Sequence, residues 1–208
     1  MMITNARESP ARPVRSFLRP LNCDARYGLT LLAALGFLGL LAAGGPAWAA
    51  RLQYERSAIV AGEWWRLLTA HWVHLGARHL LLDAAGLVLL WVLYARELRP
   101  LTWLLVLAGA TGVIDAGLWW GEPQITWYLG LSGLLHAFWS AGAAGAALRR
   151  NPLGYLMLVI LAVKLGVEQA SGGSMVTEAF PVVTTSHWYG AVGGLVVIAA
   201  LALGRKPL

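Results

Sequence analysis

Four polar side chains stand at the starts of otherwise apolar segments. Ser132 and His187 each open a long apolar run, and His79 and Asp83 open a third. Polar groups inside membrane spans are energetically costly, so each of them is a candidate functional residue. A neutral imidazole can accept the proton of a serine hydroxyl and later return it to a leaving amine. The serine and histidine together therefore predict the acyl-transfer chemistry of a peptidase.

The composition places these residues in a membrane protein. Of the 208 residues, 58% are hydrophobic and 12% are charged, against about 25% charged residues in soluble domains. A helix of about 20 apolar residues crosses the hydrocarbon core of a bilayer. The pattern predicts an all-α membrane protein with six spans, at 28–48, 79–94, 101–120, 130–148, 153–169 and 186–204.

The basic residues predict the orientation of these spans. Eleven of them lie in the N-terminal tail, after the second and fourth spans, and at the C-terminus, whereas four lie in the first loop. Because cytoplasmic loops are rich in Lys and Arg, both termini are expected in the cytoplasm. The expected organisation is a basic tail (1–26), a membrane domain (27–204) and a short second tail (205–208).

Composition also limits other function classes. The net charge of +6 comes from short connectors rather than from one basic face with interleaved aromatics, so no nucleic-acid partner is expected. Cys23 is the single cysteine, which excludes an internal disulfide. An alternative interpretation of the N-terminus is a signal peptide cleaved after Ala47-Trp48-Ala49. Its apolar run is long for that, and cleavage would leave five spans.

Topology brings Ser132 to the level of the other polar groups. Spans two, four and six run in the same direction, so their first turns lie at one depth near the outer face. Gly130 and Gly133 flank Ser132 closely and let another backbone approach it. In addition, the N–H groups of a helix's first turn have no intrahelical partner and can stabilise an oxyanion.

His187 stands at the outer end of a face of small residues. Gly190 follows at i+3, and Gly194 lies a further four residues along. Such a face allows close helix packing in a membrane. A histidine at the matching depth is therefore the expected partner of Ser132.

These motifs resemble those of the rhomboid intramembrane serine proteases. The Gly-x-Ser-Gly of 130–133 and the His-x-x-Gly-x-x-x-Gly of 187–194 are similar to that family's catalytic motifs, and the His-x-x-x-Asp of 79–83 to its His-x-x-x-Asn. Three residues match its first-loop Glu-x-Trp-Arg element: Glu63, Trp65 and Arg66. The resemblance implies a rhomboid-like six-helix bundle with a structured first outer loop. It also implies Ser132 as nucleophile, His187 as general base and acid, and no cofactor.

Within that family the chain is most similar to the rhombosortase branch. The matching stretches are 65–71, 79–82, 130–136, 164–169 and 181–183. This resemblance implies an enzyme of the bacterial inner membrane with its active site near the periplasmic face. The implied substrates are membrane-anchored secreted proteins, whose glycine-rich, membrane-spanning C-terminal sorting tail is removed. Transfer of the new C-terminus to an amine is a second outcome that the branch implies.

Two residues near the expected site depart from the family pattern. Asp83 replaces the asparagine that supports the oxyanion. Either a protonated Asp83 donates a hydrogen bond itself, or an ionised Asp83 orients His79, which then donates; the second is preferred. His136 lies one turn beyond Ser132. It is expected to stack on His187 or to hydrogen-bond in the cavity, with a purely structural buried histidine as the alternative.

Other ionisable groups receive smaller roles. Lys164 and Glu168 are an i, i+4 pair that is expected to neutralise itself, with binding of the tail or an acceptor amine as the alternative. Histidines 71, 74, 79 and 187 suggest a metal, but no His-Glu-x-x-His pattern is present, so none is expected.

Two other function classes compete with the protease interpretation. An inactive rhomboid-like protein that binds membrane clients remains an alternative, because Asp83 is not the expected residue. A small transporter is disfavoured, since the polar groups gather near one face and no internal repeat is evident.

Overall fold

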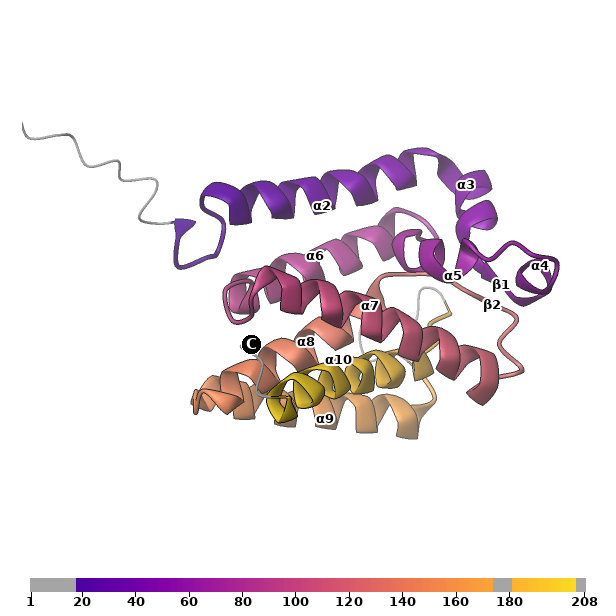
Figure 1. Cartoon of the computed structure of the whole chain (residues 1–208). Coiled ribbons are helices and arrows are strands. Elements are labelled where there is room, and N and C mark those ends of the chain that lie inside the picture. Colours follow the sequence, from indigo (N-terminus) through magenta and orange to yellow (C-terminus); the bar gives the residue numbers. More distant parts are fainter. Residues whose placement is uncertain (1–17, 174–180, 205–208) are drawn as a thin grey trace, which may run out of the picture.

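The computed structural model describes residues 18–173 and 181–204. The C-terminal tail (205–208) and most of the basic N-terminal tail (1–26) lie outside the described residues. The chain is mostly helical, and Figure 1 shows the long helices running roughly side by side. They are α2 (Ala25–Ala43), α6 (Ala77–Tyr94), α7 (Pro100–Ala116), α8 (Ser132–Leu148), α9 (Pro152–Ser171) and α10 (Thr185–Leu203).

Five of the described helices are long and apolar enough to cross a membrane. They are α2, α6, α9, α10, and α7 together with the short π-helix η2 (Gly117–Gly121) that continues it. The predicted fourth span corresponds to α8, which has 17 residues. The chain is therefore a membrane protein with several apolar helices, and the count of six spans stays a prediction.

The first predicted span was wrong at its C-terminal end. A single helix was expected over 28–48, but α2 ends at Ala43 and Trp48 lies on a separate helix, α3 (Gly45–Leu52). Gly45 adopts a φ of +70°, a left-handed conformation that favours glycine. Pro46 follows at the start of α3, where its missing N–H leaves no helical bond unmade. The chain turns sharply at this point in Figure 1.

Short elements follow α3 and form the first loop. Two two-residue strands, β1 (Tyr54–Glu55) and β2 (Trp127–Tyr128), pair antiparallel and modify the all-α expectation. This pairing attaches the first loop to the segment that leads into α8. The loop also contains α4 (Arg56–Val60), α5 (Arg66–Thr69) and η1 (Ala70–Trp72).

Arg56 reinforces this attachment. Its guanidinium donates to the carbonyl oxygens of Leu118 at 2.6 Å, Trp119 at 3.0 Å, Glu122 at 3.1 Å and Ile125 at 3.3 Å. One side chain thus satisfies four carbonyl groups where the helical hydrogen bonds of η2 end. The first loop and the end of η2 are held as one unit.

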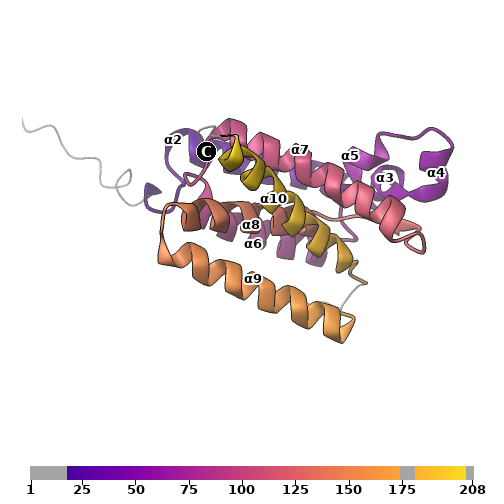
Figure 2. The same cartoon turned by 60° about the horizontal axis from the view of Figure 1, so that its bottom comes forward.

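Helix α8 lies at the centre of the bundle and packs against α6, α7, α9 and α10. Figure 2 shows α9 along one edge of this arrangement. Small residues allow the close approach. The ring of Tyr94 occupies the space beside Gly142, and the backbone at Ala143 and Ala147 lies against Gly154. Such small-residue contacts are typical of helix packing in membranes.

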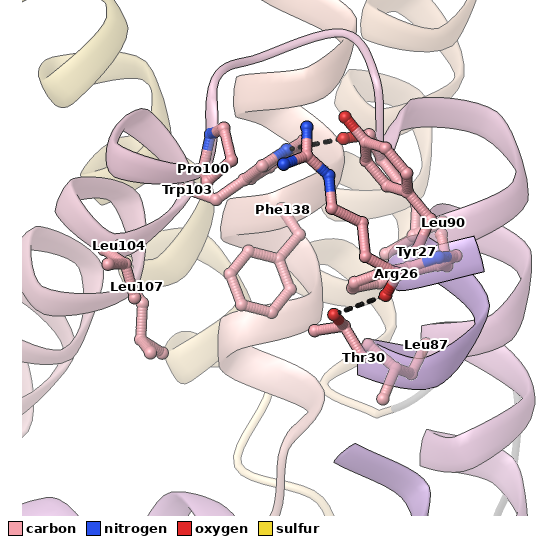
Figure 3. Close-up of a pocket in the computed structure, with 12 residues that line it drawn as sticks. Arg26, Tyr27, Thr30, Leu87, Leu90, Pro100, Trp103, Leu104, Leu107 and Phe138 are labelled. Atoms are coloured by element: carbon pink, nitrogen blue, oxygen red, sulfur yellow. Dashed lines mark hydrogen bonds between the residues drawn. The ribbon is translucent and has the colours of Figure 1, made fainter. Parts of the chain in front are cut away.

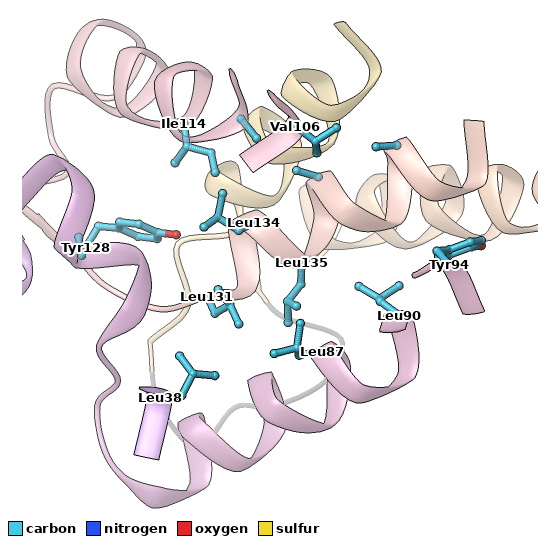
Figure 4. Close-up of a cluster of buried hydrophobic side chains, with 14 of the residues drawn as sticks. Leu38, Leu87, Leu90, Tyr94, Val106, Ile114, Tyr128, Leu131, Leu134 and Leu135 are labelled. Carbon is cyan, nitrogen blue, oxygen red and sulfur yellow. The ribbon is translucent and has the colours of Figure 1, made fainter. Parts of the chain in front are cut away.

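The buried apolar core extends from α8 toward α6 and α7. Figure 4 shows Leu134 and Leu135 of α8 within it, with Leu87 of α6 and Ile114 of α7 nearby. Leu131, directly before the nucleophile candidate, is 1% exposed and belongs to the same cluster. The start of α8 is therefore fixed by packing on its apolar side.

Helix α2 stands apart from most of the bundle. A mostly apolar groove of about 380 Å³ lies between the N-terminal part of α2 and helices α6, α7 and α8, and Figure 3 shows Tyr27, Trp103 and Phe138 around it. The groove lies toward the C-terminal end of α6 and the N-terminal end of α7. It is therefore at the end of the bundle opposite to Ser132.

Candidate active site

Ser132 and His187 are within hydrogen-bonding distance of each other. Ser132 is the first residue of α8, and His187 lies in the first turn of α10. The Oγ atom of Ser132 is 3.0 Å from Nε2 of His187, and the histidine is 3% exposed. This is the geometry that a nucleophile and its general base require.

Glycines hold the two helices in backbone contact at this point. A Cβ on Gly190 would overlap the carbonyl oxygen of Gly133, the residue after the nucleophile candidate. One turn further, a Cβ on Gly194 would overlap the backbone of Ala137. The close spacing of α8 and α10 depends on the lack of a side chain at Gly190 and Gly194. The distance from Ser132 to His187 depends on the same spacing.

The second ring nitrogen of His187 also has a partner. Nδ1 lies 2.9 Å from Oε2 of Glu168 on α9, and the same oxygen lies 2.6 Å from Nζ of Lys164. Glu168 is fully buried, at 0% exposure. The sequence indicated the Lys164–Glu168 ion pair but not the contact with His187. The available signal was an acid near the outer end of the fifth span, at the depth of the histidine.

His136 lies directly against His187. The two rings stack with centroids 4.0 Å apart and an interplanar angle of 13°, and Nδ1 of His136 lies 2.7 Å from the carbonyl oxygen of Ser132. Both contacts are of the kind that the sequence suggested for this position. The stack limits rotation of the His187 ring.

Ligand atoms of His136, Glu168 and His187 lie within 4.8 Å of one another, close enough to suggest a metal. A metal ion, however, binds in the plane of an imidazole ring, at about 2.0–2.1 Å from its nitrogen. Two parallel stacked rings cannot both point their lone pairs at one ion. This cluster therefore does not fit a metal without rotation of a ring.

Asp83 braces the segment before the nucleophile candidate. Its Oδ2 accepts a hydrogen bond from the N–H of Leu131 at 2.9 Å, and lies 3.1 Å from Nε2 of His74 and 3.4 Å from Nε2 of His79. Nδ1 of His79 accepts from the N–H of Leu75 at 3.4 Å, which leaves Nε2 to carry the proton. This Asp83 oxygen therefore accepts from Leu131 and His79, and His74 donates to it as well when its proton is on Nε2. This geometry supports an orienting carboxylate, and sequence reasoning missed the contributions of His74 and Leu131.

Tyr128 holds the same segment from the other side. Its hydroxyl donates to the carbonyl oxygen of Gly130 at 3.0 Å, and burial raises the pKa of Tyr128, so the donor proton is retained. Gly130 adopts a φ of +122°, and a Cβ there would lie 2.8 Å from the ring of His79. Only glycine fits both the conformation and the space. Sequence reasoning missed this contact.

The first-loop motif contributes structure rather than chemistry. Arg66 binds Glu63 at 2.6 Å through Nε, and its Nη1 donates to the carbonyl oxygens of Ala50 and Gln53 at 2.9 Å. Trp65 is 52% exposed. Glu63, Trp65 and Arg66 are absent from the lining of the cavity beside Ser132. Their contacts join the loop to the end of α3.

The cavity beside Ser132 is large enough for a peptide segment. It measures about 400 Å³ and is bounded mainly by α6 and α8, with Lys164 of α9 and His187 of α10 at its edge. Its polar end contains Ser132, His187, His79, Asp83, His136 and Lys164, and its apolar wall includes Leu82, Leu89, Leu135 and Trp139. A narrower pocket on the other side of Ser132 is lined by Trp127, Leu129 and Pro181. The dyad therefore faces an apolar space between helices.

Comparison with known proteins shows the family of the chain. The model of the rhomboid domain family matches residues 61–204, which include both site residues. The chain belongs to the rhomboid family. It is 28% identical over 153 residues to Rhomboid protease GluP of Bacillus subtilis (strain 168), covering 73% of this chain. It is 26% identical over 157 residues to Putative rhomboid protease YdcA of the same organism, covering 71% of this chain and 72% of that one.

The match covers different shares of the lengths of the two relatives. The match spans only 29% of the length of Rhomboid protease GluP. The rhomboid domain and these protease relatives support an intramembrane serine protease.

Proposed function

We propose that this rhomboid is an active intramembrane serine endopeptidase, with Ser132 as nucleophile and His187 as general base and acid. The observation that carries the proposal is the 3.0 Å contact between Ser132 Oγ and His187 Nε2. A client-binding protein without activity has no need of this alignment. Burial of His187 and its stack on His136 keep the imidazole in position before substrate arrives.

The chemistry follows the general serine hydrolase scheme. Ser132 Oγ bonds to the scissile carbonyl carbon while its proton passes to His187 Nε2 and the carbonyl electron pair moves to the oxygen. As the carbonyl re-forms, the C–N bond breaks and Nε2 gives its proton to the leaving amine. Water or an amine then attacks the acyl-enzyme. His187 takes a proton from the attacking group, and as the bond between the acyl carbon and Ser132 Oγ breaks, it returns that proton to Oγ.

The start of α8 supplies the oxyanion site in this proposal. The N–H of Ser132 lies in the first turn of the helix, where it has no intrahelical acceptor. The N–H of Leu131 is directed to Asp83 instead. Asp83 thus fixes the conformation of the segment before Ser132. In serine hydrolases, removal of one oxyanion donor lowers kcat by about 10²–10³-fold. His79 borders the same cavity, but its Nε2 proton faces Asp83 in this structure, so its ring must turn before it can donate to the oxyanion.

We further propose substrates of the rhombosortase type. These are secreted proteins held in the membrane by a C-terminal tail with a glycine-rich segment, an apolar helix and a basic cluster. The largely apolar cavity between α6 and α8 suits an unwound, small-residue segment that leaves the bilayer. The proposed location is the bacterial inner membrane, with both termini cytoplasmic and Ser132 near the periplasmic face. Hydrolysis and transfer to an amine share the same acyl-enzyme.

Coexpression with such a tail substrate tests the proposal. The wild type is expected to shorten the substrate at its C-terminus, and Ser132→Ala and His187→Ala are expected to abolish the shortening. The control is Ser57→Ala, an exposed first-loop serine outside the site. Mass spectrometry of the product distinguishes a free carboxyl from an amide. Processing that persists in either site variant rejects the dyad. Client capture without processing by the wild type favours the binding alternative.

A further inference from the structure

The contacts of His187 continue beyond the dyad. Ser132 Oγ lies 3.0 Å from Nε2 of His187, Nδ1 lies 2.9 Å from Oε2 of Glu168, and that oxygen lies 2.6 Å from Nζ of Lys164. The four side chains come from three helices, α8, α10 and α9. Hydrogen-bonding distances link Ser132, His187 and Glu168, and an ion pair adds Lys164; we call these four side chains the site relay.

Glu168 determines which nitrogen of His187 carries the proton. A carboxylate paired with a lysine is ionised and can only accept hydrogen bonds. Nδ1 must therefore be protonated to face Glu168 at 2.9 Å. The lone pair is then on Nε2, toward Ser132, which is the tautomer that a general base needs. Without this partner, the imidazole is free to adopt the other tautomer.

Lys164 offsets the charge of Glu168. Glu168 is completely buried and the side chain of Lys164 is 14% exposed, so both charges are largely removed from water. A lone buried carboxylate beside an imidazole would hold a second proton on the ring and disable the base. With Lys164 in place, the resting relay is neutral overall. The imidazolium that forms during the reaction is still stabilised by Glu168.

The other ionisable groups around His187 do not take this role. His136, on α8, stacks face to face with the ring and makes its hydrogen bond to Ser132. Asp83 and His79, on α6, border the same cavity, but Oδ2 of Asp83 is directed to Leu131 and His74. Among the described residues, Glu168 is the carboxylate within hydrogen-bonding distance of Nδ1.

We propose that Glu168 is the positioning residue of a Ser132–His187–Glu168 triad, and that Lys164 compensates its charge. The inference rests on the proposed protease function, because a triad is meaningful only if Ser132 is a nucleophile. In this triad, α9 takes part in the reaction through Glu168. The triad also turns an ion pair that the sequence presented as structural into part of the site.

An alkyl fluorophosphonate probe tests the triad on the full chain in detergent without any knowledge of the substrate. The Oγ–P bond forms as fluoride leaves, so the labelling rate against pH reports Ser132 and its base. Glu168→Gln is expected to slow labelling by about 10⁴-fold, the size of comparable substitutions in serine proteases. Glu168→Asp should restore part of this loss. With a cleavable tail substrate, kcat should fall while KM stays within about twofold.

The two partners of the ion pair should shift the pH profile in opposite directions. Glu168→Gln removes the negative charge that favours imidazolium, so the acid limb moves to lower pH. Lys164→Met leaves that charge uncompensated, so the acid limb moves to higher pH. Glu97→Gln is the matched control, because it removes an acid paired with Arg149 at the other end of the bundle. It should leave both rate and profile unchanged.

Several results would overturn the triad. One is labelling by Glu168→Gln within about threefold of wild type, with an unshifted acid limb and an unchanged melting temperature. Shifts of the same sign in both variants would reject the charge compensation. If wild-type Ser132 neither labels nor cleaves, the protease function fails separately. ¹⁵N-histidine NMR then still decides the contact, since the inference requires a proton on Nδ1 of His187 that Glu168→Ala displaces.

Discussion

Gly190→Ala should separate the nucleophile from its base. The added methyl would overlap the carbonyl oxygen of Gly133 and lie 2.8 Å from its carbonyl carbon. Non-bonded carbon atoms prefer about 3.5–4.0 Å, so α8 and α10 must part locally by roughly 1 Å. The distance from Ser132 Oγ to His187 Nε2, now 3.0 Å, would then exceed hydrogen-bonding range.

Both activity and stability should respond to Gly190→Ala. A displacement of about 1 Å in a catalytic constellation lowers the rate by about 10²-fold, and overpacking of a close interface costs about 1–3 kcal/mol. The assays are fluorophosphonate labelling of Ser132 and thermal unfolding in detergent. Gly112→Ala is the control, because a Cβ at that position on α7 meets nothing within 4 Å.

Gly112→Ala is expected to leave labelling unchanged and to match or exceed the wild-type melting temperature, since alanine favours the helix over glycine by up to about 1 kcal/mol. Labelling of Gly190→Ala at the wild-type rate would refute the reasoning. It would mean that the two helices are not held at their observed spacing by backbone contact. A melting temperature that falls while labelling is preserved would place the strain away from Ser132.

Two further variants test the supports of the site. Asp83→Asn removes the charge from the acceptor of Leu131, His74 and His79. Charged hydrogen bonds exceed neutral ones by about 1 kcal/mol, so a lower melting temperature and slower labelling are expected, and unchanged turnover would rule out a need for negative charge. Arg56→Ala should lower the melting temperature and expose the 117–126 segment to proteolysis, because its carbonyls lose their donor; an unaltered digestion pattern would contradict this.

The common depth of Ser132 and His187 in the bundle could be predicted from the sequence, because this depth depends only on the direction in which each helix runs. Ser132 and His187 begin spans that run the same way, so a correct count of crossings between them puts both at one depth. Their side-chain contact also needed the helix faces to meet. The glycines at 190 and 194 indicated that face, because helices approach closely where side chains are missing.

Contacts that depend on helix rotation could not be predicted in the same way. Glu168 meets His187 only because α9 turns that side of its surface toward the bundle. Periodicity is a weak guide here, since the outward face of a membrane helix is as apolar as its inward face. The contact of His74 with Asp83 joins a loop to a helix and depends on the path of the first loop.

Local signals explain the errors at the boundaries. The Gly44-Gly45-Pro46 sequence is a recognisable helix breaker, and hydropathy outweighed it in the prediction of a span over 28–48. The pairing of β1 with β2 involves only two residues in each strand. Such a short ribbon has no alternation to detect, and its partners are more than 70 positions apart in the chain.

The enclosure of α8 determines how the bilayer can act on the site. At about 1.5 Å per residue, its 17 residues span about 26 Å, less than the roughly 30 Å of a typical hydrocarbon core. Four other helices surround it, so a thicker or thinner bilayer deforms around them instead. The depth of Ser132 in the membrane is therefore set by the neighbouring helices. The membrane helix of the proposed substrate is not enclosed by other helices in this way. The thickness of the bilayer should therefore change which of its peptide bonds reaches Ser132.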